Sequence, residues 1–196
     1  RGALIESFRL IRTNLNYLSD KNKVIMITSS IKGEGKTFTA INLAQSLSSA
    51  KGNKVLVLGL DLRNPQIHAY LDINKNEKNG ITNYLINNSQ DIDSLISKND
   101  NVDFDFILSG PIPPNPSELL GSNKMAKLIE SLENEWDIVL FDSPPLVAVT
   151  DATMVSQEID TIIIVVKVGQ TDKKAFEHTI QSLRNVKAPI GGVVLN

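Results

Sequence analysis

The sequence predicts an α/β fold in which helices cover both faces of a mostly parallel central sheet, an arrangement of three layers. Short runs of β-branched and apolar residues alternate with stretches of helical periodicity along the 196 residues. Several runs are apolar at nearly every position, which is typical of strands buried on both faces. The alternation favours parallel pairing, because each crossover then lays a helix over the sheet. We interpret residues 1–196 as a single domain.

The first expected element is a helix over Leu4–Leu18, within an N-terminal segment of residues 1–20. Apolar residues recur at helical spacing on one face of this segment. Glu6, Arg9 and Arg12 lie three residues apart on another face. From these residues alone, a solvated face with internal salt bridges is the simpler interpretation.

The remaining elements follow the same alternation. The apolar β-branched runs predict strands at Val24–Thr28, Val55–Leu60, Phe104–Leu108, Ile138–Phe141, Thr161–Val166 and Ile190–Leu195. Apolar residues at helical spacing predict helices at Thr37–Ala50, Glu118–Glu133 and Lys173–Asn185. The segment Gln66–Asp100 follows neither period clearly.

Composition excludes several classes of function. The chain has 20 Lys and Arg against 22 Asp and Glu, and a net charge of −2 argues against a nucleic-acid-binding protein that relies on bulk positive charge. Cysteine is absent, which excludes disulfides, thiolate metal sites and iron–sulfur clusters. No segment approaches the roughly 18–20 apolar residues that a membrane-spanning helix needs.

A phosphate-binding pattern follows the first predicted strand. Gly33-x-Gly35-Lys36-Thr37 stands between that strand and a predicted helix. Glycines let the backbone approach phosphate oxygens, and the helix N-terminus favours an anion. In such a loop Lys36 contacts the β- and γ-phosphates and the Thr37 hydroxyl binds Mg²⁺. Ser30 stands where the full pattern has its first glycine. The alternative is an ordinary glycine turn that ends in a surface lysine.

Two carboxylates directly follow apolar runs. Asp142 ends the run Ile138–Phe141, as in a Walker B strand, and Asp61 follows Val55–Leu60. The carboxyl ends of parallel strands share one edge of a sheet, so both should lie beside the phosphate loop. Carboxylates there can hold Mg²⁺ and orient a nucleophile. The alternative makes each of them a helix cap or a turn former.

Together these motifs resemble the cytoplasmic kinase domain of the bacterial tyrosine kinases, a family of the MinD/ParA-like P-loop ATPases that regulates polysaccharide export. The resemblance runs nearly end to end. It rests on Glu6-x-x-Arg9-x-x-Arg12, Gly33-Glu34-Gly35-Lys36-Thr37, Asp61-Leu62-Arg63-Asn64-Pro65, Pro114-Asn115-Pro116-Ser117-Glu118-Leu119-Leu120, Phe141-Asp142-Ser143-Pro144-Pro145 and Thr150-Asp151-Ala152. The loop and the Walker B strand occur in many ATPases, whereas the first and fourth segments are more specific.

The resemblance implies an ATP-dependent protein-tyrosine kinase with a P-loop NTPase fold. Its catalytic residues would be Lys36, Asp61 and Asp142, and Mg²⁺ would be held by Thr37, Asp61 and Asp142. The residues that would bind ATP are Lys32, Gly33, Glu34, Gly35, Lys36, Thr37, Phe38 and Asn196. One carboxylate near the metal would accept the phenolic proton.

The resemblance also implies how the domain is used. In this family the first helix joins subunits into a ring, so Glu6, Arg9 and Arg12 would lie in the subunit interface and each site would phosphorylate a neighbour. It implies a membrane-spanning adaptor region in the same or a partner chain, a phosphotyrosine phosphatase as partner, and a place at the cytoplasmic face of the bacterial inner membrane. We expect the sequence to be a piece of a longer protein, whose tyrosine-rich C-terminal tail lies outside it.

Two departures from related sequences keep alternatives open. Gly59 stands where the family commonly has the first of two aspartates, which leaves the catalytic base unassigned and favours a nucleotide-binding scaffold without full activity. Ile31 stands at the position of the signature lysine of partition and division-site ATPases. This departure weakens the other alternative, a MinD/ParA-type switch whose ATP cycle controls dimerisation.

Overall fold

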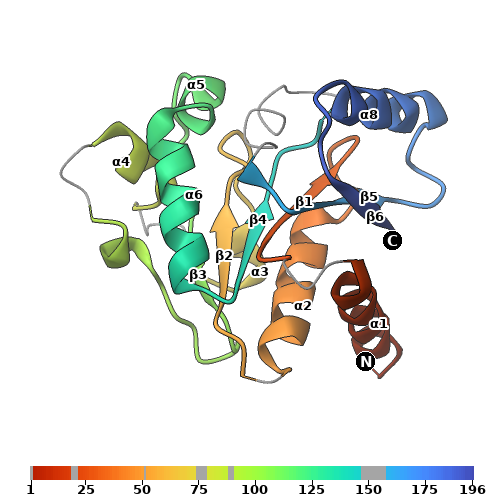
Figure 1. Cartoon of the computed structure of the whole chain (residues 1–196), viewed down its shortest axis with the longest axis horizontal. Coiled ribbons are helices and arrows are strands. Elements are labelled where there is room, and N and C mark those ends of the chain that lie inside the picture. The colour runs from red at the N-terminus through yellow and green to blue at the C-terminus, as the bar shows by residue number, and fades with distance from the viewer. Residues whose placement is uncertain (1, 19–21, 51, 74–78, 88–90, 147–157) are drawn as a thin grey trace.

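The computed structural model describes residues 2–18, 22–50, 52–73, 79–87, 91–146 and 158–196. Its centre is a six-stranded sheet with the order β3-β2-β4-β1-β5-β6, and every pairing between these strands is parallel (Figure 1). The strands are β1 (Val24–Ser29), β2 (Val55–Gly59), β3 (Asp105–Ile107), β4 (Ile138–Asp142), β5 (Thr161–Val166) and β6 (Ile190–Leu195). The six predicted strands and their parallel arrangement are confirmed, and only their ends differ.

Helices cover both faces of the sheet, which confirms the three layers (Figure 1). One face carries α1 (Gly2–Leu18), α2 (Lys36–Ser48) and α3 (Ile67–Tyr70). The other carries α4 (Ile81–Ile86), α5 (Pro116–Leu120), α6 (Asn123–Glu135) and α8 (Lys173–Asn185). Within the described ranges, no helix has the length and apolar character needed to cross a bilayer.

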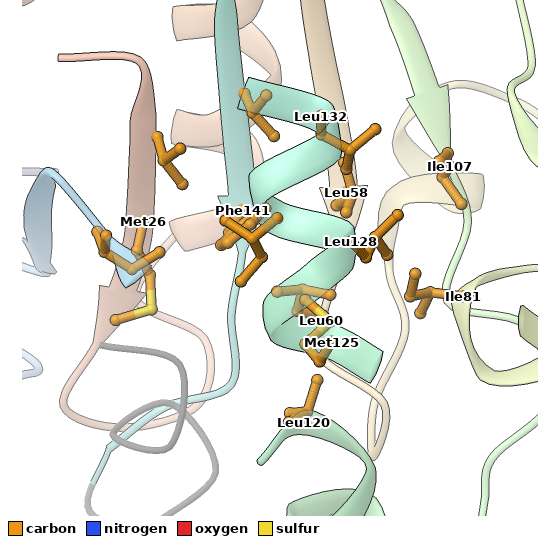
Figure 2. Packing of buried hydrophobic residues seen from close by; sticks show 14 of the residues in the cluster. Met26, Leu58, Leu60, Ile81, Ile107, Leu120, Met125, Leu128, Leu132 and Phe141 are labelled. Carbon is orange, nitrogen blue, oxygen red and sulfur yellow. The ribbon is translucent and has the colours of Figure 1, made fainter. Parts of the chain in front are cut away.

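The two cores follow from the alternation of side chains along each strand. On β1, Ile25 and Ile27 pack with the core under α1 and α2, while Val24 and Met26 pack with the opposite core. Met26 and Phe141 from neighbouring strands lie beside α6, which contributes Met125, Leu128 and Leu132 (Figure 2). Because both faces of the sheet are covered, its strands read as continuous apolar runs.

The prediction of a single helix over Glu118–Glu133 was wrong. The structure has two helices, α5 and α6, separated by Gly121 and Ser122. Ser122 is the N-cap of α6, and its hydroxyl accepts a hydrogen bond of 3.2 Å from the backbone N–H of Met125. Likewise, the irregular segment Gln66–Asp100 contains α3, α4 and a 3₁₀ turn at Asp93–Leu95.

Strand order places the phosphate loop at a reversal in the sheet. The chain runs from β1 through α2 to β2 on one side, whereas β5 and β6 lie on the other side of β1. Open parallel sheets bind ligands at such a point, outside the carboxyl ends of the strands. The ends of β2 and β4, with Asp61 and Asp142, lie next to it.

Candidate active site

The phosphate loop connects the end of β1 to the start of α2. Gly33 has a φ of 87° and Gly35 a φ of 95°, a left-handed conformation that favours glycine. A Cβ at Gly35 would lie 2.2 Å from Nδ2 of Asn196. The Asn196 amide donates a 2.9 Å hydrogen bond to the carbonyl of Glu34, so the residue after β6 is tied to this loop. A contact of Asn196 with the nucleotide stays a prediction.

Lys36 forms a buried ion pair inside the site. Its Nζ lies 2.8 Å from Oδ2 of Asp61, and the two side chains are 8% and 3% exposed. Oδ1 of Asp61 accepts a 3.0 Å hydrogen bond from the backbone N–H of Asn64. Lys36 is the first residue of α2, so this ion pair holds an ammonium group with three N–H donors next to the phosphate loop. The structure thus places Lys36 and Asp61 side by side, and their roles in catalysis stay predictions.

Thr37 and Asp142 form the other half of the site. The Thr37 hydroxyl donates a 2.8 Å hydrogen bond to Oδ2 of Asp142. The backbone carbonyl of Asp142 accepts hydrogen bonds of 2.9 and 3.0 Å from the N–H groups of Leu60 and Asp61. These bonds hold the ends of β2 and β4 together, so the two carboxylates are fixed relative to the loop.

The Thr37–Asp142 pair has the chemistry of a Mg²⁺ site. Among the described residues, Oδ1 of Asp142 is buried and has no hydrogen-bond partner. Burial raises the pKa of Asp142 from its ordinary 3.8 to about 6, the charge of Asp61 adds to the rise, and Lys36 and the Thr37 hydrogen bond oppose it. A buried carboxylate oxygen beside a hydroxyl is a ligand pair that a hard divalent cation prefers. The residues present thus fit a magnesium ion.

Glu34 differs from the other loop residues because its carboxylate is turned into the protein. One oxygen accepts a 2.8 Å hydrogen bond from the N–H of Ile31, and the other accepts one from the Thr171 hydroxyl. The Thr171 oxygen in turn accepts a 2.9 Å bond from the N–H of Lys167. Glu34 thus links the phosphate loop to the loop after β5. Thr171 was not predicted, since no motif marks it.

Lys32 and Phe38 lie at the edge of the loop. Lys32 is exposed, and the ring of Phe38 packs between those of Phe8 and Tyr70, at centroid distances of 6.1 and 6.5 Å. The Phe38 side chain therefore joins α1, α2 and α3. A contact of either residue with ATP stays a prediction.

Gly59 faces a wall that leaves no room for a side chain. A Cβ at Gly59 would lie 2.6 Å from Oγ of Ser109 and 3.2 Å from Cδ1 of Ile67. The Ser109 hydroxyl donates a 2.7 Å hydrogen bond to the carbonyl of Gly59. An aspartate at this position would displace Ser109. Ser109 and Ile67 thus fill the space that a larger side chain at residue 59 would need.

The Gly59→Ala variant tests this close packing. We expect it to lower the free energy of unfolding by about 1–3 kcal/mol, because the added methyl group overpacks a rigid wall. Gly192→Ala is the matched control, because a Cβ at this second strand glycine meets nothing within 4 Å. Urea unfolding of the two variants measures the difference. Equal stabilities of the two variants would contradict the packing at Gly59.

The residues predicted for the subunit interface lie on α1. Arg9 forms an exposed 3.3 Å ion pair with Glu6. Arg12 donates a 2.6 Å hydrogen bond to the carbonyl of Ser46 and so ties α1 to α2. Glu6 and Arg9 thus lie on the surface, where a second subunit could contact them. Arg12 instead makes a contact within the domain.

Two further motif segments have different outcomes. The segment Pro114–Leu120 includes α5, and its Ser117 hydroxyl accepts a 3.4 Å hydrogen bond from Arg63, which belongs to the second Walker motif. The structure therefore brings the second Walker motif and the family-specific segment Pro114–Leu120 together. The motif Thr150-Asp151-Ala152 lies outside the described residues.

Comparison with known proteins identifies relatives along nearly the whole chain. Residues 22–190 match the family described as AAA domain. Tyrosine-protein kinase YwqD from Bacillus subtilis (strain 168) is 36% identical over 193 residues, which are 97% of this chain and 80% of YwqD. Tyrosine-protein kinase Etk from Escherichia coli (strain K12) is 31% identical over 194 residues, 98% of this chain and 26% of Etk. The chain thus spans most of YwqD and about a quarter of Etk.

Solved structures agree with this relationship. The kinase domain of E. coli Etk superposes with a TM-score of 0.91 at 31% identity, covering 98% of this chain and 74% of that one. McdA of Cyanothece in complex with ATP has a TM-score of 0.73 at 20% identity, and the match covers 88% of this chain and 69% of that one. At this low identity, the likeness to McdA shows only that the two proteins share a fold. Because the identity to these kinases is above 30% and extends over 97% of the chain or more, the chain belongs to the family of bacterial tyrosine-protein kinases, within the P-loop ATPases.

Proposed function

We propose that this domain is an ATP-dependent protein-tyrosine kinase that transfers the γ-phosphoryl group of MgATP to a tyrosine hydroxyl. The observation that carries the proposal is the group of four buried side chains at the phosphate loop: Lys36 paired with Asp61, and Thr37 bonded to Asp142. This group supplies a cation for the phosphates, a metal-binding pair and a second carboxylate. The family relationship selects tyrosine as acceptor.

Each of these four side chains has its own role in the proposed reaction. Lys36 and the loop N–H groups bind and orient the β- and γ-phosphates, where charge develops in the transition state. Thr37 and Asp142 would hold Mg²⁺, which would supply positive charge next to the phosphates. We assign Asp61 as the base that accepts the phenolic proton. Its carboxylate is buried beside Lys36, and it is Asp142, not Asp61, that accepts the hydrogen bond of Thr37.

The role of the whole protein follows from the family and goes beyond this domain. We infer that it autophosphorylates in trans within a ring joined through α1, and that this regulates polysaccharide synthesis and export. A membrane-spanning adaptor region, in the same or a partner chain, and a phosphotyrosine phosphatase complete the proposed system at the cytoplasmic face of the bacterial inner membrane. The much greater length of Etk leaves room for such a region there.

Two other functions compete with this proposal. A MinD/ParA-type switch ATPase is favoured by the fold shared with McdA. A nucleotide-binding scaffold is favoured by Gly59, because a glycine supplies no carboxylate at the end of β2.

Incubation with MgATP and a tyrosine peptide separates the three functions. We expect phosphotyrosine on the peptide. ADP release without phosphotyrosine would instead identify a switch ATPase. Nucleotide binding without either product would identify a scaffold. Mass spectrometry of the peptide and an ADP assay on the same sample provide both readouts.

The ring interface makes a separate prediction about Arg9. Arg9→Ala should reduce the oligomer size measured by light scattering without lowering the unfolding midpoint, because the side chain is 58% exposed and its ion pair is on the surface. Lys173→Ala is a matched control, since Lys173 also forms an exposed ion pair on a helix, with Glu177 at 3.7 Å. An oligomer of wild-type size for Arg9→Ala would remove α1 from the interface.

A further inference from the structure

The phosphate loop contains a carboxylate, which is an unfavourable group for a loop that binds anions. Glu34 lies between Gly33 and Gly35, whose left-handed conformations shape the loop, and its side chain is fully buried. Like charges repel more strongly where water is excluded, so a free carboxylate here would weaken phosphate binding. The loop therefore needs the charge of Glu34 to be held by donors of the protein itself.

Donors from two segments hold the Glu34 carboxylate. One oxygen accepts a 2.8 Å hydrogen bond from the N–H of Ile31, within the loop. The other accepts a hydrogen bond from the hydroxyl of Thr171, which lies 137 residues further along the chain. The carbonyl of Ile31 in turn accepts a 2.8 Å bond from the Ser29 hydroxyl. The peptide groups on both sides of Ile31 are thus fixed, one of them through Glu34.

Thr171 belongs to a short turn after β5 that lies against the phosphate loop. Its hydroxyl oxygen accepts a 2.9 Å bond from the N–H of Lys167, and its own N–H donates a 2.9 Å bond to the Lys167 carbonyl. An ionised carboxylate only accepts hydrogen bonds, so Thr171 donates its hydroxyl proton to Glu34. The amide nitrogen of Gln170 lies 3.6 Å from the Cβ position of Gly33.

The central sheet holds this turn beside the loop. Val165 of β5 is paired with Ser29 of β1, so the two strands end next to each other. The phosphate loop continues from β1, and the turn with Thr171 continues from β5. The position of the Thr171 hydroxyl is therefore set by the sheet, before any nucleotide binds.

We propose that Thr171 is a positioning residue for the nucleotide phosphates, which holds the Glu34 carboxylate in the interior and thereby keeps the phosphate loop in its binding conformation. The inference rests on the nucleotide-binding part of the proposed function and adds a residue that no sequence motif marks. Without the Thr171 hydroxyl, a buried carboxylate oxygen loses its donor, which favours conformations with Glu34 turned toward solvent. Nucleotide affinity then falls in proportion to the fraction of molecules that keep the binding conformation.

Thr171→Val tests the proposal, because valine has nearly the shape of threonine and lacks its hydroxyl. The Kd for MgADP, measured by isothermal titration calorimetry, should rise about five- to twentyfold. Thr171→Ser keeps the hydroxyl, and its Kd should stay within about twofold of the wild-type value. A serine variant that binds as weakly as the valine variant would overturn the proposal.

A double-mutant cycle shows whether Thr171 acts through Glu34. In a Glu34→Ala background no carboxylate remains to be held, so adding Thr171→Val should leave the Kd for MgADP nearly unaltered. An equal rise in both backgrounds would overturn the proposal. Thr179→Val is the matched control, because the Thr179 hydroxyl donates a 2.9 Å bond to the Ala175 carbonyl within α8. Its Kd should equal that of the wild type, and a rise as large as for Thr171→Val would also contradict the proposal.

Hydrogen exchange provides a readout without nucleotide. The N–H of Ile31 donates to Glu34, so in the ligand-free chain it should exchange faster in Thr171→Val than in the wild type. The N–H of Asp137 donates a 3.1 Å bond to the Lys54 carbonyl, at the opposite edge of the sheet, and its exchange should not change. Equal exchange at Ile31 in the two proteins would mean that Thr171 does not hold the loop.

Failure of this inference differs from failure of the kinase function. A wild type that binds MgADP, with no effect of Thr171→Val on the Kd, would overturn the inference alone. The expected Kd values without any phosphotyrosine would support the role of Thr171 and overturn the kinase function.

Discussion

Lys36→Met is expected to abolish tyrosine phosphorylation and to destabilise the ligand-free domain at the same time. The variant loses the cation that binds the β- and γ-phosphates, and removal of one such group costs about 100-fold or more in rate. It also leaves the Asp61 carboxylate buried without its partner at 2.8 Å. Breaking a buried ion pair from one side costs about 3–5 kcal/mol. Kinase assays and urea unfolding measure the two losses.

A double variant separates these two effects. Lys36→Met combined with Asp61→Asn removes both charges of the ion pair, so the carboxylate of Asp61 no longer stands unpaired in the interior. The free energy of unfolding should return most of the way to that of the wild type, while phosphorylation stays undetectable. A double variant as unstable as Lys36→Met would show that the ion pair does not account for the stability of this site.

Asp142→Asn is expected to stabilise the ligand-free domain at neutral pH while abolishing its activity. Burial raises the pKa of Asp142 from 3.8 to about 6, so the folded state disfavours the ionised carboxylate. The folded chain binds more protons than the unfolded chain between these values, and stability falls as pH rises through this window. One pKa unit corresponds to about 1.4 kcal/mol, which makes the loss on the order of 3 kcal/mol above pH 6.

The asparagine variant should not show this loss, because its side chain is neutral and can still accept the Thr37 hydrogen bond. Its stability should match that of the wild type near pH 4 and exceed it above pH 6, as measured by urea unfolding between pH 4 and 8 without Mg²⁺. Mg²⁺ with a non-hydrolysable ATP analogue should stabilise the wild type strongly and the variant little. A variant less stable than the wild type at pH 7.5 would contradict a desolvated Asp142.

Much of the architecture can be predicted from the sequence because buried parallel strands leave a strong pattern. The runs Val55–Leu58 and Ile162–Val166 are apolar throughout, and neither lies in an edge strand of the sheet. The boundary between α5 and α6 is harder to predict from the sequence, because only two residues, Gly121 and Ser122, interrupt the helical period. A glycine followed by serine, with a new apolar period after it, is the sign that marks this boundary.

Some residues of the candidate site could also be predicted from the sequence, and others could not. The phosphate-loop motif and the strand ends identify Lys36, Asp61 and Asp142, because their position follows from local sequence and sheet topology. The contacts of Thr171 with Glu34 and of Ser109 with Gly59 join segments 137 and 50 residues apart. Such contacts depend on tertiary packing and leave no local pattern.

The ratio of phosphotyrosine formed to ADP released tests the central assignment most directly. With a tyrosine peptide at saturating concentration, a kinase passes each γ-phosphoryl group to the phenol, so the two amounts should rise together at a ratio close to one. Both should vanish in Asp142→Asn. ADP that accumulates without phosphotyrosine, at any peptide concentration, would mean that this site delivers phosphate to water and would contradict its assignment as a tyrosine kinase.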